Sequence, residues 1–127
     1  MRQLIISMLI LFTVSCNKNK DSIIIDVRQW QMTKVVGAST GTINQQIALT
    51  VSWPYSSGCD VLDKFEESRN GNIIIVKAYG HSEDGPCTMD AGYKTKIYNF
   101  VSTQTGTFEL RFTNIDNSFI SHTVTIN

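Results

Sequence analysis

The sequence has little of the chemistry by which enzymes and nucleic-acid-binding proteins are recognised. Its 127 residues carry 11 lysines and arginines against 11 aspartates and glutamates, and no basic stripe stands out that could neutralise a phosphate backbone. It has only two histidines, no His-Glu-x-x-His motif and no phosphate-binding loop. We therefore expect no nucleic-acid partner, no catalytic residues, no cofactor and no enzymatic activity.

No apolar run is long enough to span a bilayer comfortably. The run from Leu4 to Phe12 follows Arg2 and has the length of a signal-peptide core. After it come the small residues of Thr13-Val14-Ser15, then Cys16, then the polar residues 17–22. This order of apolar core, small residues, cysteine and hydrophilic tether resembles the lipobox of bacterial lipoproteins.

The lipoprotein resemblance implies a processing route and an address. Residues 1–15 would be a signal peptide, Cys16 the acylated first residue of the mature chain, and residues 16–22 a lipidated cysteine with its tether. Several acyl chains, each contributing about 0.8 kcal/mol per buried methylene, anchor a protein stably to a membrane. Asn17 replaces the aspartate that retains some such proteins at the inner membrane, so the resemblance implies the outer membrane of the bacterial envelope.

The cysteine count supports a disulfide. Three cysteines are an odd number for an exported protein, but lipidation of Cys16 would leave Cys59 and Cys87 as a pair. Each follows a glycine-containing stretch just beyond a predicted strand. We expect a bridge between the loop after Trp53 and the loop before Tyr93, near one end of the domain, with the two Cα atoms within about 7 Å.

Hydrophobic alternation and β-branched runs predict an all-β domain over residues 23–127. The seven expected strands cover residues 23–32, 43–53, 60–69, 73–79, 93–101, 107–113 and 119–126. The first changes face near Arg28-Gln29, as strands do when they pass between the sheets of a sandwich. Pro54 should end the second strand. A helix capped by Asp60 is the alternative for the third, but the hairpin signal Asn70-Gly71 favours a strand.

The last third of the chain carries a resemblance to a fold. The order Tyr98-Asn99-Phe100, a polar turn, Gly106 to Phe112 and a final strand of threonine and valine resembles the closing strands of bacterial immunoglobulin-like domains. It implies a seven-stranded immunoglobulin-like β-sandwich. By register, we expect these residues in the core: Trp53, Tyr98, Phe100, Phe108, Leu110 and Phe112. Glu109 and Arg111 should be exposed.

The sequence does not favour a metal site. His81, Cys87 and Met89 supply the imidazole, thiolate and thioether that suit copper, but Thr88 follows Cys87 where blue-copper sites have a histidine, and Cys59 competes for the thiol.

The other candidate ligands are also better explained by ordinary structure. Glu83, Asp84 and Asp90 could bind calcium, yet they lack the alternating spacing of a calcium loop and are expected to form a solvated acidic loop. His122 is expected to be a half-buried strand residue whose ring finds a backbone partner.

Binding is the favoured class of function. Tyr55, Tyr79 and Tyr93 lie near strand ends, where rings can stack on a sugar or anchor a protein, and Glu83 and Asp84 lie near the predicted disulfide. We therefore predict a lipid-anchored, non-catalytic binding or structural module of the bacterial envelope, with a protein or glycan ligand. The alternative is a small envelope inhibitor or immunity-type lipoprotein whose end loops block an enzyme. A metal or redox protein is a third and weaker alternative.

Replacing the lipobox cysteine tests the anchor. Cys16→Ser should abolish incorporation of labelled fatty acid and leave the precursor uncleaved by the lipoprotein pathway, because the acylated thiol is gone. Gel analysis after metabolic labelling measures both, with Ser15→Ala as the control that keeps a small residue before the cysteine. Normal lipid labelling of the serine variant would show that the lipobox assignment is wrong.

Overall fold

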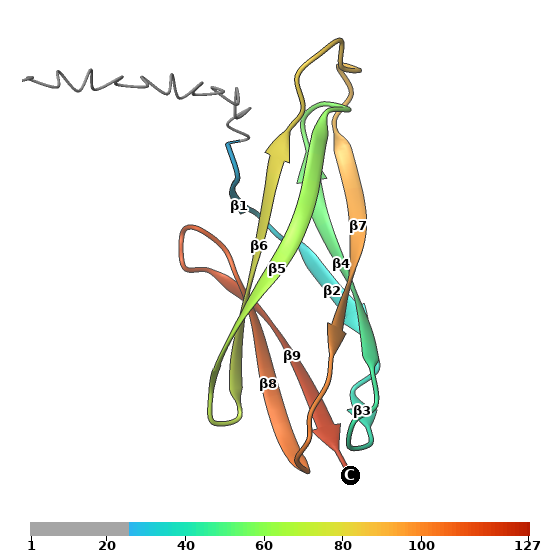
Figure 1. Ribbon diagram of the computed structural model, residues 1–127, viewed down its shortest axis with the longest axis vertical. Helices are drawn as coiled ribbons and strands as arrows, with labels where there is room; N and C mark the ends of the chain where they lie inside the picture. The colour runs from blue at the N-terminus through green and yellow to red at the C-terminus, as the bar shows by residue number, and fades with distance from the viewer. Residues whose placement is uncertain (1–25) are drawn as a thin grey trace, which may run out of the picture.

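The computed structural model describes residues 26–127, which fold into nine β-strands in two sheets, with no helix among them (Figure 1). The strands are β1 (Arg28–Trp30), β2 (Lys34–Gly37), β3 (Thr40–Gly41), β4 (Ile47–Tyr55), β5 (Asp60–Asn70), β6 (Ile73–Ser82), β7 (Gly92–Phe100), β8 (Gly106–Thr113) and β9 (Phe119–Ile126). It follows that this part of the chain has no helix able to span a membrane. Cys16 and the predicted signal peptide lie outside the described residues.

The two sheets differ in size. The smaller sheet has the order β2-β4-β7, and the larger has the order β1-β6-β8-β9-β3 with β5 also paired to β6. Because β5 pairs with β6 along its whole length, β1 and β8 share the other side of β6. Two neighbouring pairs, β6 with β8 and β3 with β9, are parallel, and the other pairs are antiparallel.

The strand count differs from the expected seven because two short strands, β2 and β3, lie outside the predicted strands. Of the first predicted strand, residues 23–32, the described part contains only β1, which pairs with β6 in the larger sheet. β2 then pairs with β4 in the smaller sheet, and β3 pairs with β9 in the larger sheet. The predicted change of face is thus confirmed, although the crossing lies at residues 31–33. Asn114 holds it, since its side chain accepts from Met32 N at 2.8 Å and donates to Met32 O at 3.2 Å.

Alternating residues of both sheets form the core. The predicted core residues are buried, with Leu110, Phe100 and Phe112 fully so. Their partners in the core are Met32, Ile47, Leu49, Val51, Leu62, Ile74, Val76, Ala78, Val124 and Ile126. Glu109 and Arg111 are half-buried rather than exposed, because they form an ion pair at 2.9 Å along the outer face of β8.

Both expected boundaries of β4 are wrong. Ile43 is 43% exposed and lies in a turn in which Asn44 has a φ of 62°, so β4 begins only at Ile47. Pro54 does not end β4, which continues to Tyr55. The proline is tolerated because the pairing of β2 with β4 stops at Ser52, which leaves one side of β4 without a neighbour there.

The hairpin of β5 and β6 confirms the strand prediction over the helix alternative for residues 60–69. Its turn lies one residue later than expected, at Gly71-Asn72, and Gly71 supplies the positive φ of 61°. His81, expected in a loop, lies in β6, so the irregular segment is shorter than predicted and spans residues 83–91.

The edges of β5 and β7 are joined by lysines rather than by a ladder. Lys94 and Lys96 occupy the inward register of β7, and their ammonium groups reach the backbone of β5. Lys94 Nζ donates to Asp60 O at 3.1 Å, and Lys96 Nζ donates to Leu62 O and Asp63 O, each at 2.9 Å. Inward-pointing charge is one way in which natural sheets prevent edge-to-edge aggregation.

The register of β8 predicts a stability difference between neighbouring residues. Leu110→Ala should lower the free energy of unfolding by about 2 to 5 kcal/mol, because it opens a cavity between the sheets. Glu109→Ala should lower it by less than about 1 kcal/mol, because it removes only a surface ion pair. Urea unfolding followed by tryptophan fluorescence measures both, and equal stability of the two variants would contradict the assigned faces.

Candidate binding site at the disulfide end

One end of the sandwich is closed by a disulfide between two loops. Cys59 and Cys87 are bonded, with their Cα atoms 5.4 Å apart, which confirms the predicted bridge. The bridge joins the loop of residues 56–59, after β4, to the loop of residues 83–91, before β7. We call this region, with the adjoining strand ends, the disulfide end; it forms the upper tip of the molecule in Figure 1.

A buried carboxylate organises the first loop. Asp60 is 3% exposed, and its Oδ2 accepts from Ser56 N at 2.8 Å, Ser56 Oγ at 3.1 Å and Ser57 N at 3.2 Å. Its Oδ1 accepts from Ser82 Oγ at 2.6 Å, which ties the loop to the end of β6. Burial alone would raise the pKa of this carboxyl, but the hydrogen bonds from Ser82, Ser56 and Ser57 outweigh it and lower the pKa.

Backbone hydrogen bonds connect the two loops directly. Gly58 N donates to Thr88 O at 2.9 Å, and Glu83 N donates to Cys59 O at 2.9 Å. A side chain at Gly58 would collide with the hydroxyl of Thr88 and would displace it, whereas glycine lets the loops approach closely without that shift. The two loops are therefore held by covalent, backbone and side-chain contacts at once.

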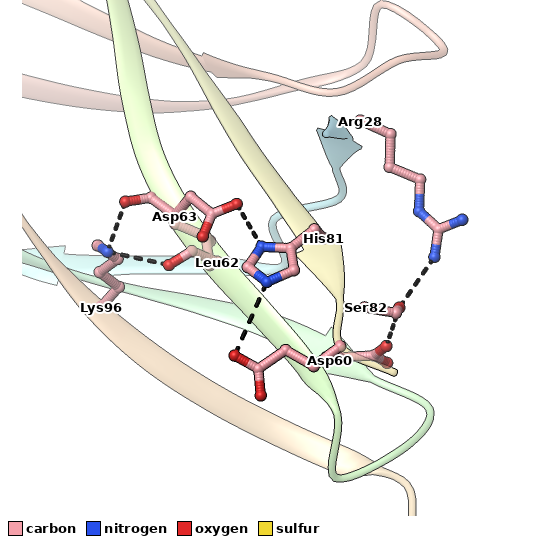
Figure 2. A network of polar contacts seen from close by, with 8 residues as sticks. Arg28, Asp60, Leu62, Asp63, His81, Ser82 and Lys96 are labelled. Atoms are coloured by element: carbon pink, nitrogen blue, oxygen red, sulfur yellow. Dashed lines mark hydrogen bonds and ion pairs between the residues drawn. The ribbon is translucent and has the colours of Figure 1, made fainter. Parts of the chain in front are cut away.

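A polar network continues along the outer face next to this end (Figure 2). His81 Nδ1 lies 2.7 Å from Asp63 Oδ2, and His81 Nε2 lies 3.8 Å from Glu83 Oε1. Asp63 is the extra residue of a β-bulge between Leu62 and Lys64. The bulge explains how the carbonyl of Asp63 reaches Lys96 while its carboxylate reaches His81. Sequence reasoning missed Asp63, because no local pattern indicates a bulge at that position.

The three side chains considered as copper ligands, for which a disulfide was favoured instead, do not converge. Cys87 is bridged and offers no thiolate, Met89 is 94% exposed, and His81 is engaged with Asp63. Among residues 26–127 no group of three or more His, Cys, Asp or Glu side chains is placed to hold a metal ion. Asp90, from the acidic loop, instead accepts from the hydroxyl of Tyr55 at 3.3 Å.

The three candidate tyrosines lie in different surroundings. Tyr55 is half-buried at the disulfide end, with Lys94 Nζ 4.6 Å from its ring centroid. The negative charge of Asp90 is the main cause that raises the pKa of its hydroxyl. Tyr93 flanks this end and is 72% exposed. Tyr79 lies apart, on the outer face of β6, where Lys64 Nζ is 5.8 Å from its ring centroid.

The disulfide end thus brings together four of the five tentative binding residues, and only Tyr79 lies elsewhere. Tyr55 supports the loops, Glu83 and Asp84 are exposed, and Met89 is an exposed apolar side chain that sequence reasoning treated only as a metal ligand. What the arrangement offers chemically is a rigid, mostly acidic surface with one protruding thioether.

The segment between β2 and β3 carries a serine flanked by glycines. Gly37-Ala38-Ser39-Thr40-Gly41 fits the pattern Gly-x-Ser-x-Gly, and His122 Nε2 lies 3.0 Å from Ala38 O. A nucleophile elbow needs a strand, a sharp turn and a helix, whereas β2 and β3 flank this segment. The ring nitrogen of His122 meets a backbone carbonyl, as expected for a half-buried strand histidine, and no carboxylate in the described residues contacts it.

Comparison with known proteins assigns the chain to a fold family. A family model described as the ORF11 beta-sandwich domain matches residues 49–126, which covers the chain from within β4 to the end of β9. No curated protein and no solved structure gives a match. The match supports the β-sandwich and carries no statement about a ligand.

Asp60 predicts a pH-dependent contribution to stability. Asp60→Asn should lower the free energy of unfolding at neutral pH by about 1 to 3 kcal/mol, because an amide cannot accept all four hydrogen bonds. The folded pKa lies below the unfolded value of about 3.9, so the carboxylate stabilises the fold above that pH and the contribution disappears as the pH falls further.

Urea unfolding between about pH 7 and pH 3 measures this effect. The gap between wild type and Asp60→Asn should narrow in acid, while the exposed Asp84→Asn should follow the wild type throughout. A gap that stays constant down to the lowest pH would mean that the charge of Asp60 does not stabilise the loop.

Proposed function

The chain belongs to the ORF11 beta-sandwich domain family, and from this premise we propose that it is a lipid-anchored, non-catalytic binding module of the bacterial envelope. The support for the anchor is the signal-peptide-like run followed by Cys16 and a polar tether. The bridge between Cys59 and Cys87 agrees with an oxidising compartment outside the cytoplasm. The outer membrane is the proposed address, on the basis of Asn17.

We also propose that the sandwich is a variant of the immunoglobulin-like fold. The support is the division of strands, with β4 and β7 in one sheet, β8 and β9 in the other, and a first segment that changes sheet. Two features depart from that fold, in which both sheets are antiparallel: β6 lies beside β8 and β3 lies beside β9 in parallel pairs.

The observation that carries the binding proposal is the rigidity of the disulfide end. Loops fixed by a disulfide, a buried carboxylate and backbone hydrogen bonds lose little entropy when a partner docks. They present Met89, the acidic residues Glu83 and Asp84, and the neighbouring Tyr93. A partner with a basic rim and an apolar pocket for the thioether would complement this surface.

The position of β1 indicates how far from the membrane that partner would lie. β1 pairs with the last residues of β6, so the chain enters the domain close to the disulfide end (Figure 1). Residues 17–25 separate Cys16 from the described chain and reach roughly 30 to 35 Å when fully extended. The proposed partner is therefore a protein in the membrane or near its surface. An enzyme blocked by the two loops is the alternative partner.

Site-specific photo-crosslinking in cells tests this proposal. A photoreactive residue at Met89 should give a crosslinked protein in envelope extracts, whereas one at the exposed Thr103, in the loop between β7 and β8, should not. Mass spectrometry identifies the captured partner, and an enzyme among the products would favour the inhibitor alternative. Equal crosslinking from both positions, or none from Met89, would contradict a binding site at the disulfide end.

A further inference from the structure

A groove lies on the outer face of the larger sheet, away from the disulfide end. It forms where β6 changes neighbours, since Val76 pairs with Phe112 of β8 and Ala78 pairs with Trp30 of β1. Lys77, between them, has no partner residue on that side. The hollow has a volume of about 350 Å³, within the range of small-ligand sites. We call it the Tyr79 groove, after the aromatic residue in its wall.

The wall of the groove combines an apolar patch with groups that form hydrogen bonds. Tyr79 and Ile75, both on the outward register of β6, supply the apolar part. Ser68 of β5, Thr113 of β8 and Asn117 of the following turn supply hydroxyl and amide groups that both donate and accept. Since β5 already pairs with β6 along this stretch, side chains rather than an open backbone ladder would recognise a ligand here.

The charges in the wall are largely compensated. The carboxylate of Glu66 lies 3.1 Å from Lys64 Nζ, and that of Glu67 pairs with Arg69 and accepts from the hydroxyl of Tyr98. The exposed carboxylate of Glu66 keeps lone pairs that can accept from hydroxyl groups. Lys77 contributes a positively charged ammonium group that donates hydrogen bonds. A strongly charged ligand of either sign would therefore be repelled by a group of the same charge. A neutral ligand rich in hydroxyl groups would find hydrogen-bond donors and acceptors and no such repulsion.

The turn that closes the groove is fixed before any ligand arrives. Asn114 is 6% exposed and is bonded to both backbone groups of Met32. Asp116 accepts from Ser118 N at 3.1 Å and from Ser118 Oγ at 2.6 Å. Asn117, between them, is held at a φ of 66°, which asparagine tolerates better than most residues. The fold therefore fixes the backbone of Asn117, from which its side chain lines the groove.

We propose that the Tyr79 groove binds a neutral oligosaccharide. A sugar ring has an apolar face, which Tyr79 and Ile75 would cover, and a rim of hydroxyl groups, which the side chains around them would bond. The volume accommodates a short segment of a chain rather than a folded partner. This site is separate from the disulfide end and does not depend on the lipid anchor.

Affinity electrophoresis of the full chain tests the proposal, in a detergent without a sugar headgroup. The probes are soluble neutral polysaccharides in the gel: xyloglucan, galactomannan, glucomannan and mixed-linkage β-glucan. At least one should retard the wild type. Tyr79→Ala should weaken binding about tenfold or more, whereas Tyr79→Phe, which keeps the ring, should stay within about threefold. Ile97→Ala, which removes an exposed apolar side chain on β7 of the smaller sheet, outside both proposed sites, should bind as the wild type does.

A second variant guards against simple unfolding of Tyr79→Ala. Asn117→Gly removes the amide, and glycine accepts the φ of 66° without strain, so the turn should persist while binding weakens. Thermal melts establish that each variant is folded. Failure of every polysaccharide to retard the wild type, or equal binding by the wild type, Tyr79→Ala and Asn117→Gly, would overturn the saccharide site. Neither result would bear on lipidation of Cys16 or crosslinking at Met89.

Discussion

The contact on which the open side of the sandwich depends is the pair of lysines between β7 and β5. β5 and β7 are edge strands of different sheets and do not pair with each other, yet both border the core. Lys94 and Lys96 satisfy three carbonyls of β5 with their ammonium groups while their aliphatic stems lie in the inward register. With the carbonyl of Asp63 held in this way, the bulge is fixed, and the carboxylate of Asp63 is left facing His81.

The disulfide end extends this arrangement beyond the sheets. Lys94 bonds the carbonyl of Asp60, and the carboxylate of the same residue gathers the loop that carries Cys59. The bridge to Cys87 therefore closes loops that are already positioned by hydrogen bonds. Its main effect is expected on the unfolded chain, whose entropy it lowers.

Sequence patterns predicted what local periodicity determines and missed what distant neighbours determine. The alternation of Phe108, Leu110 and Phe112 identified a buried face, and the odd cysteine count identified the bridge. The continuation of β4 through Pro54 depends on where β2 ends, which no property of that segment reveals. The bulge at Asp63 belongs to the pairing of β5 with β6, and the groove at Tyr79 forms where β6 exchanges β8 for β1 as its neighbour. Both depend on contacts between strands, which a local pattern in one segment does not reveal.

The geometry of β6 links the two proposed sites. The inward residues of β6 become smaller toward the disulfide end, from Ile74 to Gly80. The ring of Trp30 packs directly against Gly80, where any side chain would collide with it, and this close contact lets β1 cover that end of β6. Because β1 pairs only as far as Ala78, the groove opens below it. The same short strand would therefore lead the chain toward its anchor and leave the outer face free beside it. A tethered domain of this kind would meet a membrane-proximal protein with its tip and a polysaccharide with its flank, so the two ligands would not compete.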